Sequence, residues 1–215
     1  MNNDNDKLKW DNYYANDNIV PPWESEKPFH GLIKALNELN LNPRDFNNVI
    51  ELGCGRSQSA IYLSSQLYNV TAIDFCSKAI NDAKLLSDKV NWICGDILDD
   101  NLFNNSVILK ESYDIVFDMQ CFHVLKDINE TRACEVIFNC LKKGGLAIII
   151  VGAKFLTIEQ PKTGPTLLTI EEFTTPFLKT GLQLVSIEVS EFNETEYYLT
   201  LENIPKCYIG IFKKC

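Results

Sequence analysis

Histidines and clusters of basic residues are scarce in this chain of 215 residues. The two histidines, His30 and His123, lie far apart and outside any array of metal ligands, so the sequence favours no metal site. Lysine and arginine number 20 against 29 aspartates and glutamates, and the basic residues do not gather in one segment. Because contact with a phosphate backbone needs such gathering, we expect no nucleic-acid partner.

Long apolar runs are also missing. The longest, LAIIIVGA from Leu146, is far shorter than the roughly 20 residues that cross a bilayer, so no membrane partner is expected. The first ten residues, MNNDNDKLKW, are polar and lack the apolar core of a signal peptide. The eight cysteines include no C-x-x-C pair, which is typical of reduced thiols. Together these absences predict a cytoplasmic protein.

Strand-like and helix-like segments alternate along most of the chain, whose residues are 46% hydrophobic and 23% charged. The expected strands are residues 48–52, 69–75, 90–97, 113–119 and 146–152, and the expected helices are 59–67, 77–87 and 128–144, the last stopped by Gly144. Such alternation is typical of right-handed βαβ units in a parallel sheet with helices on both faces.

The last part of the chain follows a different pattern. Thr169 and Glu172 have the spacing of a capping box, which predicts the start of a helix. Residues 182–192 and 207–214 then read as two strands with no helix between them, so they are expected to pair antiparallel. The fold class predicted is therefore α/β: a single doubly wound, Rossmann-like domain whose sheet has seven strands, mostly parallel, with an antiparallel C-terminal strand.

A glycine bend follows the first predicted strand, in the stretch NNVIELGCGRSQSAIYLSS. Gly53 and Gly55 lack a Cβ, so the backbone there can turn tightly and approach a ligand closely. The helix behind them would offer unpaired N–H groups. A dinucleotide site of the type G-x-G-x-x-G needs a third glycine, and Gln58 stands in its place. The bend thus predicts a cofactor site, with a nicotinamide cofactor as the less favoured choice.

The stretch E-L-G-C-G, from Glu51 to Gly55, resembles the first motif of class I S-adenosylmethionine-dependent methyltransferases. The resemblance implies S-adenosyl-L-methionine as cofactor and extends over about residues 47–152. Asp74, followed by Phe75, ends the second strand at the distance where an acidic residue grips ribose hydroxyls. In this family an Asp after the third strand often binds adenine, and here that residue is Asp96, followed by Ile97.

The N-terminal segment, residues 1–24, narrows the resemblance. Its W-D-x-x-Y and P-P-W-E stretches resemble the thiopurine, thiol and halide methyltransferase group, which implies that Trp10, Tyr14 and Trp23 fold over the cofactor. The stretch FDMQCFHVL resembles the D-R-G-C-F-H segment of bacterial relatives and places Met119 at a cofactor contact. Met119 and Gln120 stand where relatives often carry Arg-Gly or an aromatic residue.

Residues 25–215, predicted to begin with a helix capped by Ser25, would then be the methyltransferase domain. The resemblance implies a small-molecule acceptor, such as a thiol, which needs little proton removal, and no catalytic base is predicted. The acceptor cavity is expected between the aromatic segment, residues 119–123 and a lid loop at 153–169. His123 and Cys121 are interpreted as structural. Two alternatives stay open: a protein lysine methyltransferase, and a non-catalytic S-adenosylmethionine-binding subunit.

Overall fold

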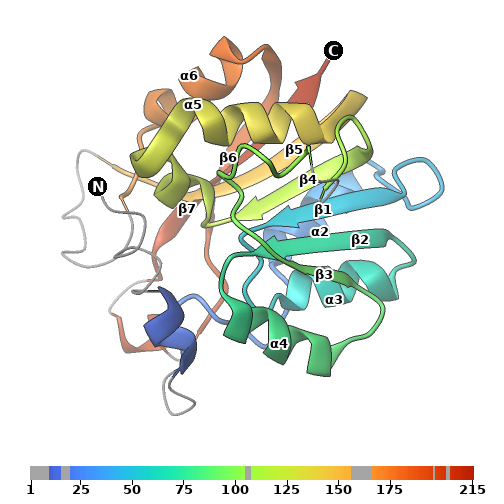
Figure 1. The fold of residues 1–215 in the computed structure, drawn as a ribbon. Helices are drawn as coiled ribbons and strands as arrows, with labels where there is room; N and C mark the ends of the chain where they lie inside the picture. Colours follow the sequence, from blue (N-terminus) through green and yellow to red (C-terminus); the bar gives the residue numbers. More distant parts are fainter. Residues whose placement is uncertain (1–9, 16–19, 105–107, 156–165, 196, 202–203) are drawn as a thin grey trace.

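A seven-stranded sheet forms the centre of the protein in the computed structural model, which describes residues 10–15, 20–104, 108–155, 166–195, 197–201 and 204–215 (Figure 1). The strand order is β3-β2-β1-β4-β5-β7-β6. The strands are β1 (Asn48–Leu52), β2 (Asn69–Asp74), β3 (Asn91–Cys94), β4 (Tyr113–Met119), β5 (Leu141–Gly152), β6 (Leu182–Glu191) and β7 (Lys206–Lys214). The helices are α2 (His30–Glu38), α3 (Gln58–Ser65), α4 (Ser77–Leu86), α5 (Phe122–Cys140) and α6 (Ile170–Lys179), with a short 3-10 turn η1 (Tyr198–Thr200).

The sheet is parallel from β3 to β5, and β7 pairs antiparallel with both β5 and β6. This arrangement confirms the fold class predicted from the sequence. β1 lies between β2 and β4, so the chain leaves β1 in one direction for β2 and returns on its other side for β4. Ligands of doubly wound sheets bind at such a switch point, beyond the carboxyl ends of the strands.

Helices cover both faces of the sheet, as Figure 1 shows: α5 and α6 lie on one side and α3 and α4 on the other. One buried core joins α5 and α6 to residues such as Ile50 and Val116. A second core joins α2, α3 and α4 to the opposite face through residues such as Val49 and Ile115. Successive side chains of β1 and β4 therefore point alternately into the two cores, as expected for strands buried on both faces.

The C-terminal part forms as predicted. The Thr169 hydroxyl accepts a hydrogen bond from the Glu172 backbone N–H at 3.2 Å, and the Glu172 carboxylate accepts from the Thr169 N–H at 2.8 Å. This capping box begins α6. Because β7 runs opposite to its neighbours, the connection between β6 and β7 returns to the edge where β1 and β4 end.

Two helix boundaries differ from the prediction. α2 begins at His30, not near Ser25, because the Ser25 hydroxyl accepts from the backbone N–H of Lys27 in a loop and the Phe29 N–H donates to Ser59. The prediction that Gly144 stops the preceding helix was also wrong. α5 ends at Cys140, since the next residues already pair with β4, and Gly144 has its positive φ inside the irregular start of β5.

α5 also starts earlier than predicted. It begins at Phe122, directly after β4, and continues through a non-helical break at Asn129. Within the described part of the chain, no helix is both long and apolar enough to span a bilayer. Of the lid loop expected at 153–169, residues 156–165 lie outside the described residues, as do residues 1–9 of the N-terminal segment.

Candidate functional site

Gly53 and Gly55 adopt left-handed backbone conformations directly after β1, with φ angles of +63° and +54°. A Cβ at Gly53 would lie 2.3 Å from the sulfur of Cys121, and one at Gly55 would lie 2.5 Å from the hydroxyl of Tyr14. Both positions therefore exclude side chains for two independent reasons, backbone conformation and close approach. The bend predicted from the sequence is present, and it is built for tight contact.

Asp74 holds this bend from the end of β2. One carboxylate oxygen accepts from the backbone N–H of Gly55 at 2.9 Å, and the other accepts from the N–H of Cys76 at 2.8 Å. The side chain is 8% exposed. Burial raises the pKa of Asp74, and the backbone N–H donors oppose that rise. Each oxygen has a second lone pair, so the carboxylate can still accept from a ligand.

Two further carboxyl groups are buried beside the bend. Burial raises the pKa of Glu51 to about 8, although a 2.6 Å hydrogen bond from the Ser57 hydroxyl opposes the rise. The charged neighbours that raise this pKa further are Asp118 and Asp74, both acidic. Burial also raises the pKa of Asp118 to about 7. Ionising these acids together is electrostatically costly without a nearby cation.

Asp118 was not among the residues predicted for the site. It ends β4 with 0% exposure, and one oxygen accepts from the backbone N–H groups of Cys121 and Phe122 at 3.1 and 3.0 Å. Its other oxygen is buried and has no hydrogen-bond partner in the described structure. The only sequence signal for Asp118 was its place in the stretch FDMQCFHVL, from which Met119 was predicted as the cofactor contact.

The aromatic residues of the N-terminal segment gather over the bend. Residues 10–15 are helical, and the Trp23 ring lies 4.9 Å from the rings of both Trp10 and Tyr13. The Trp23 indole N–H donates to the Tyr14 hydroxyl at 3.2 Å. Because that hydroxyl also contacts Gly55, the cluster closes directly onto the glycine bend. Figure 1 shows this segment beside the edge where the parallel strands end.

Six of the predicted site residues line one small cavity of about 60 Å³ at this place. They come from the N-terminal segment, β1, the bend and β4, and they are Tyr14, Trp23, Glu51, Gly53, Gly55 and Met119. Trp10 lies outside this lining and packs on Trp23 instead. The structure thus brings together residues that are more than 100 positions apart in the sequence.

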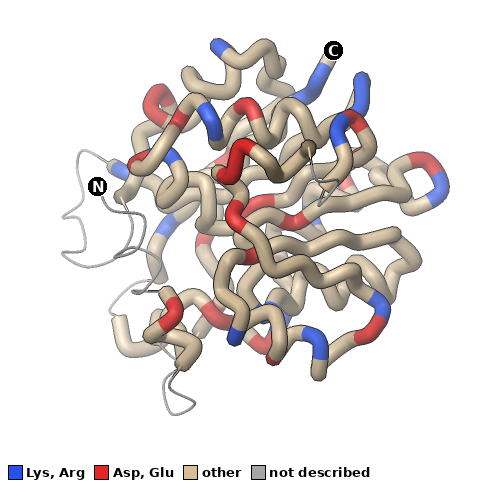
Figure 2. Tube along the Cα trace, viewed as in Figure 1, with Lys and Arg blue, Asp and Glu red and all other residues tan. Residues whose placement is uncertain are grey.

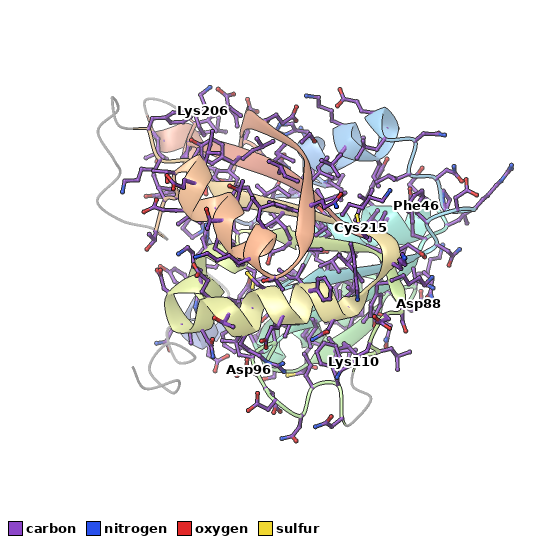
Figure 3. The ribbon with its side chains drawn as sticks, turned by 90° about the horizontal axis from the view of Figure 1, so that it is seen from above. Phe46, Asp88, Asp96, Lys110, Lys206 and Cys215 are labelled. Atoms are coloured by element: carbon purple, nitrogen blue, oxygen red, sulfur yellow. The ribbon has the colours of Figure 1, made fainter. Side chains whose placement is uncertain are left out.

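The predicted adenine contacts lie farther along the same edge. Asp96 is exposed on the loop after β3, at the rim of the molecule in Figure 3, and its carboxylate accepts from the Leu98 N–H at 2.9 Å. The Ile97 side chain is buried in the core below α5. Phe75 is half-buried, and its carbonyl accepts from the Cys94 thiol at 3.6 Å. Asp96 still raises the pKa of the Cys121 thiol, after burial, Asp118 and Asp74.

A larger cavity, of about 1020 Å³, adjoins the small one and was not predicted. Its walls come from the segment before α2, the start of α3 and the end of β6 with the following connection. Glu24 and Arg56 line both cavities and form an ion pair at 3.2 Å. The connection that follows β6 contributes Phe192 and Thr195. The cavity lies within reach of the glycine bend because the two spaces share a wall.

His123 is buried at 1% exposure in the first turn of α5. A ring nitrogen, Nδ1, accepts from the Gly152 backbone N–H at 3.4 Å, and burial lowers the pKa of His123 to about 4. The imidazole is therefore neutral at pH 7. Among the described residues, no group of three or more His, Cys, Asp and Glu side chains is arranged to hold a metal ion.

Charges of both signs are spread over the chain trace, and Figure 2 shows acidic positions among uncharged ones near the edge where the parallel strands end. Three of the acids counted in the formal charge of −9, Glu51, Asp74 and Asp118, are buried near this edge, and burial raises the pKa of each. A ligand with positive charge fits this environment better than one with a pyrophosphate group, because buried acids repel anions and need cations.

Known proteins share both the sequence pattern and the fold. Residues 49–145 match the family model described as "Methyltransferase domain". A protein of Schizosaccharomyces pombe, "Uncharacterized methyltransferase C977.03", is 34% identical over 98 residues, which are 43% of this chain and 63% of that protein. The match therefore spans somewhat less than two thirds of that relative's length.

Two solved structures illustrate the likeness in fold. The TehB-like SAM-dependent methyltransferase from Corynebacterium glutamicum has a TM-score of 0.62 at 18% identity, covering 99% of this chain and 97% of its own. The N-methyltransferase NodS from Bradyrhizobium japonicum, solved with S-adenosyl-L-homocysteine, has a TM-score of 0.67 at 17% identity, covering 97% of each chain. Residues 49–145 therefore resemble a methyltransferase domain, and the fold is one that S-adenosylmethionine-dependent methyltransferases share.

Proposed function

We propose that this protein transfers a methyl group from S-adenosylmethionine to a small, soft nucleophile, with an organic thiol as the first candidate. The observation that carries the proposal is the group of buried acids around the glycine bend. Glu51 and Asp118 are buried beside the glycine bend, where the backbone has no room for side chains. A cofactor with a sulfonium and an ammonium group would compensate the negative charge of these carboxylates when they ionise.

Each part of the site suits one part of that cofactor. Asp74 can accept hydrogen bonds from two neighbouring ribose hydroxyls through its remaining lone pairs. Glu51 and Asp118 attract the cationic methionyl end. Gly53 and Gly55 leave room for Cys121 and Tyr14 to pack directly on the bend, beside the ligand. Asp96 and Ile97 are proposed at the adenine, and Phe75 and Trp10 at the margin of the site.

The bound cofactor supplies a methyl group on a positively charged sulfur, which is already a good leaving group. The protein's tasks are to align the acceptor with that methyl group and to exclude water. The cluster of Tyr14, Trp23 and Trp10 performs the second task by closing onto Gly55. His123 is neutral and buried at pH 7, and a thiol acceptor does not require it as a base.

The acceptor is proposed to approach through the 1020 Å³ cavity. That cavity shares Glu24 and Arg56 with the small cavity beneath the aromatic cluster, so a ligand that enters it comes close to Met119. A soft acceptor suits the thioether of Met119 and the ring of Trp23 at this junction. Glu24 and Arg56 pair with each other on the shared wall, which also includes Lys27.

Two measurements test the proposal. Isothermal titration calorimetry with S-adenosylmethionine and with NAD should show binding of the first and none of the second. Release of S-adenosylhomocysteine is then measured with 2-mercaptoethanol, sulfide and iodide, and with a lysine-rich protein in parallel. Turnover with the thiol supports the proposal. Turnover with the lysine-rich protein alone would reassign the acceptor, and tight cofactor binding without any turnover would indicate a non-catalytic subunit.

A further inference from the structure

Gln120 has a left-handed backbone at the end of β4, with φ at +66°. Its N–H donates to the Ile150 carbonyl of β5 at 3.0 Å, so the sheet holds the backbone in this conformation. A residue with a side chain is disfavoured there, and glycine adopts the same conformation without cost. A strained residue beside the proposed site suggests that its side chain has a use.

The side chain of Gln120 points to the other wall of the site. Its amide nitrogen donates to the hydroxyl of Tyr198 at 3.5 Å, and Tyr198 lies in η1, in the connection between β6 and β7. Both residues are half-buried. A bond of this length is at the weak limit, so an incoming polar group can replace it. The pair therefore presents an amide and a hydroxyl group that lie close together and are joined only by a weak hydrogen bond.

Tyr198 is held firmly by its own neighbours. Its backbone N–H donates to the Thr195 hydroxyl at 3.0 Å, and its ring stacks on Phe192 at 5.9 Å with an interplanar angle of 28°. Phe192 and Thr195 line the 1020 Å³ cavity, while Met119, which precedes Gln120, lines the small cavity at the bend. Neither Gln120 nor Tyr198 is itself part of either lining, but each is next in sequence to a residue that is, Met119 for Gln120 and Leu199 for Tyr198. The pair thus lies at the boundary between the space proposed for the acceptor and the place proposed for the cofactor.

We propose that Gln120 and Tyr198 orient the methyl acceptor through hydrogen bonds, and that the acceptor is an organic thiol with a hydrogen-bonding group near its sulfur. The proposal rests on the proposed function and names the acceptor class more closely. An amide and a phenol both donate and accept, so they suit a hydroxyl, amide or amine. Iodide and sulfide offer no second group for the pair to bind.

The strain part of the proposal is tested by thermal unfolding. Gln120→Gly relieves the left-handed strain, and the melting temperature should rise by about 2–4 °C, the shift that 1 kcal/mol gives in a chain of this size. Gln120→Ala removes the amide and keeps the strain, so it should give no such rise. Leu67→Gly is the matched control, because Leu67 also has a positive φ, of +71°, and is 79% exposed at the end of α3.

The orienting part is tested by kinetics with two thiols that differ by one hydroxyl, 2-mercaptoethanol and ethanethiol. Gln120→Gly, Gln120→Ala and Tyr198→Phe should each lower kcat/KM for 2-mercaptoethanol by about three- to tenfold, the worth of one neutral hydrogen bond. The values for ethanethiol should change little, and the KM for S-adenosylmethionine should stay the same. Leu67→Gly should leave both thiols unaffected.

A double variant separates a shared role from two independent ones. If Gln120 and Tyr198 act on the same acceptor group, Gln120→Ala with Tyr198→Phe should lose less than the sum of the single losses. Equal losses for both thiols, or a loss in cofactor affinity, would contradict the orienting role. A wild-type protein that binds S-adenosylmethionine but methylates neither thiol would instead overturn the proposed function itself.

Discussion

The sulfur of Cys121 lies directly against Gly53, where an added Cβ would be 2.3 Å away from it. One hydrogen bond secures this contact, because the Cys121 N–H donates to the Asp118 carboxylate at 3.1 Å. The bend after β1 and the start of α5 are therefore closely packed against each other through Gly53 and Cys121. A change on one side should be compensated only by a change on the other.

We expect Gly53→Ala to weaken S-adenosylmethionine binding and to lower the melting temperature, since the new methyl group meets the Cys121 side chain. Cys121→Gly should restore part of the stability in the double variant, because it removes both the sulfur and the Cβ that lie within 2.5 Å. The φ of +63° prevents full rescue. Thermal unfolding of the four combinations checks this, and purely additive losses would contradict a direct contact.

Asp74→Ala should weaken S-adenosylmethionine binding by about 1–3 kcal/mol, because it removes the acceptor proposed for the ribose hydroxyls and frees the Gly55 N–H. Asp74→Asn keeps one carbonyl oxygen and should lose less. Titration calorimetry measures both. Asp96→Ala is a useful comparison on the same edge, and an affinity unchanged in Asp74→Ala would remove Asp74 from the site.

Stability should fall as the pH rises, because of Glu51 and Asp118. Their pKa values in the folded protein, about 8 and about 7, are above the ordinary values of 4.5 and 3.8. The folded protein therefore keeps these protons where the unfolded chain has released them, and the stability that they contribute is complete below about pH 4 and lost as the pH rises through 7 to 8.

Glu51→Gln should then raise the melting temperature by about 2–8 °C at pH 8.5, where about 1–2 kcal/mol is recovered, and by much less at pH 5. The Gln amide oxygen can accept from the Ser57 hydroxyl as the Glu51 carboxylate does. Scanning calorimetry at several pH values follows the difference. A gain of the same size at pH 5 and 8.5 would show that charge is not its cause.

Cofactor binding should release protons at pH 7. A cationic ligand favours the ionised forms of Glu51 and Asp118, so their pKa values fall when it binds. Calorimetry in phosphate and in Tris, which differ in ionisation enthalpy, measures the number of protons released. Asp118→Asn should reduce that number, whereas Asp114→Asn, at the far end of β4 and paired with Lys142, should not.

Trp23→Ala should lower turnover more than it lowers stability. Its partners Trp10, Tyr13 and Tyr14 form a cluster apart from the two main cores, and that cluster covers the bend. Trp92→Ala, in β3, provides the contrast, because Trp92 is buried in the core and should cost several kcal/mol. Equal activity in Trp23→Ala and wild type would show that the segment only packs.

Periodicity and glycine chemistry predicted the fold well for identifiable reasons. β1 and β4 were predicted to the residue, since each is an apolar run bounded by polar residues and bends. The start of α5 was missed although its cause is local, since the Asp118 carboxylate accepts from the N–H of Phe122, four residues later. The start of α2 was missed because a partner distant in sequence decides it: the Ser59 hydroxyl accepts from the N–H of Phe29. Local pattern carries no information about such contacts.

Sequence pattern indicates the residues that stand at strand ends, but not the features that depend on backbone conformation and packing. Glu51, Asp74 and the two glycines follow from the position of the bend. The left-handed backbone of Gln120 and the unpaired oxygen of Asp118 depend on packing between β4 and its neighbours, which no spacing rule encodes. The larger cavity lies between segments more than 130 residues apart and had no signal at all.

The reversed direction of β7 has a consequence for how such a protein can diversify. Because β7 runs against β5 and β6, the chain between β6 and β7 turns on the same edge as the glycine bend, yet shares no residue with it. Insertions or substitutions in that turn remodel one wall of the larger cavity and leave the glycine bend, proposed to hold the cofactor, unchanged. A new acceptor can thus be acquired late in the chain, independently of the machinery that its first half provides.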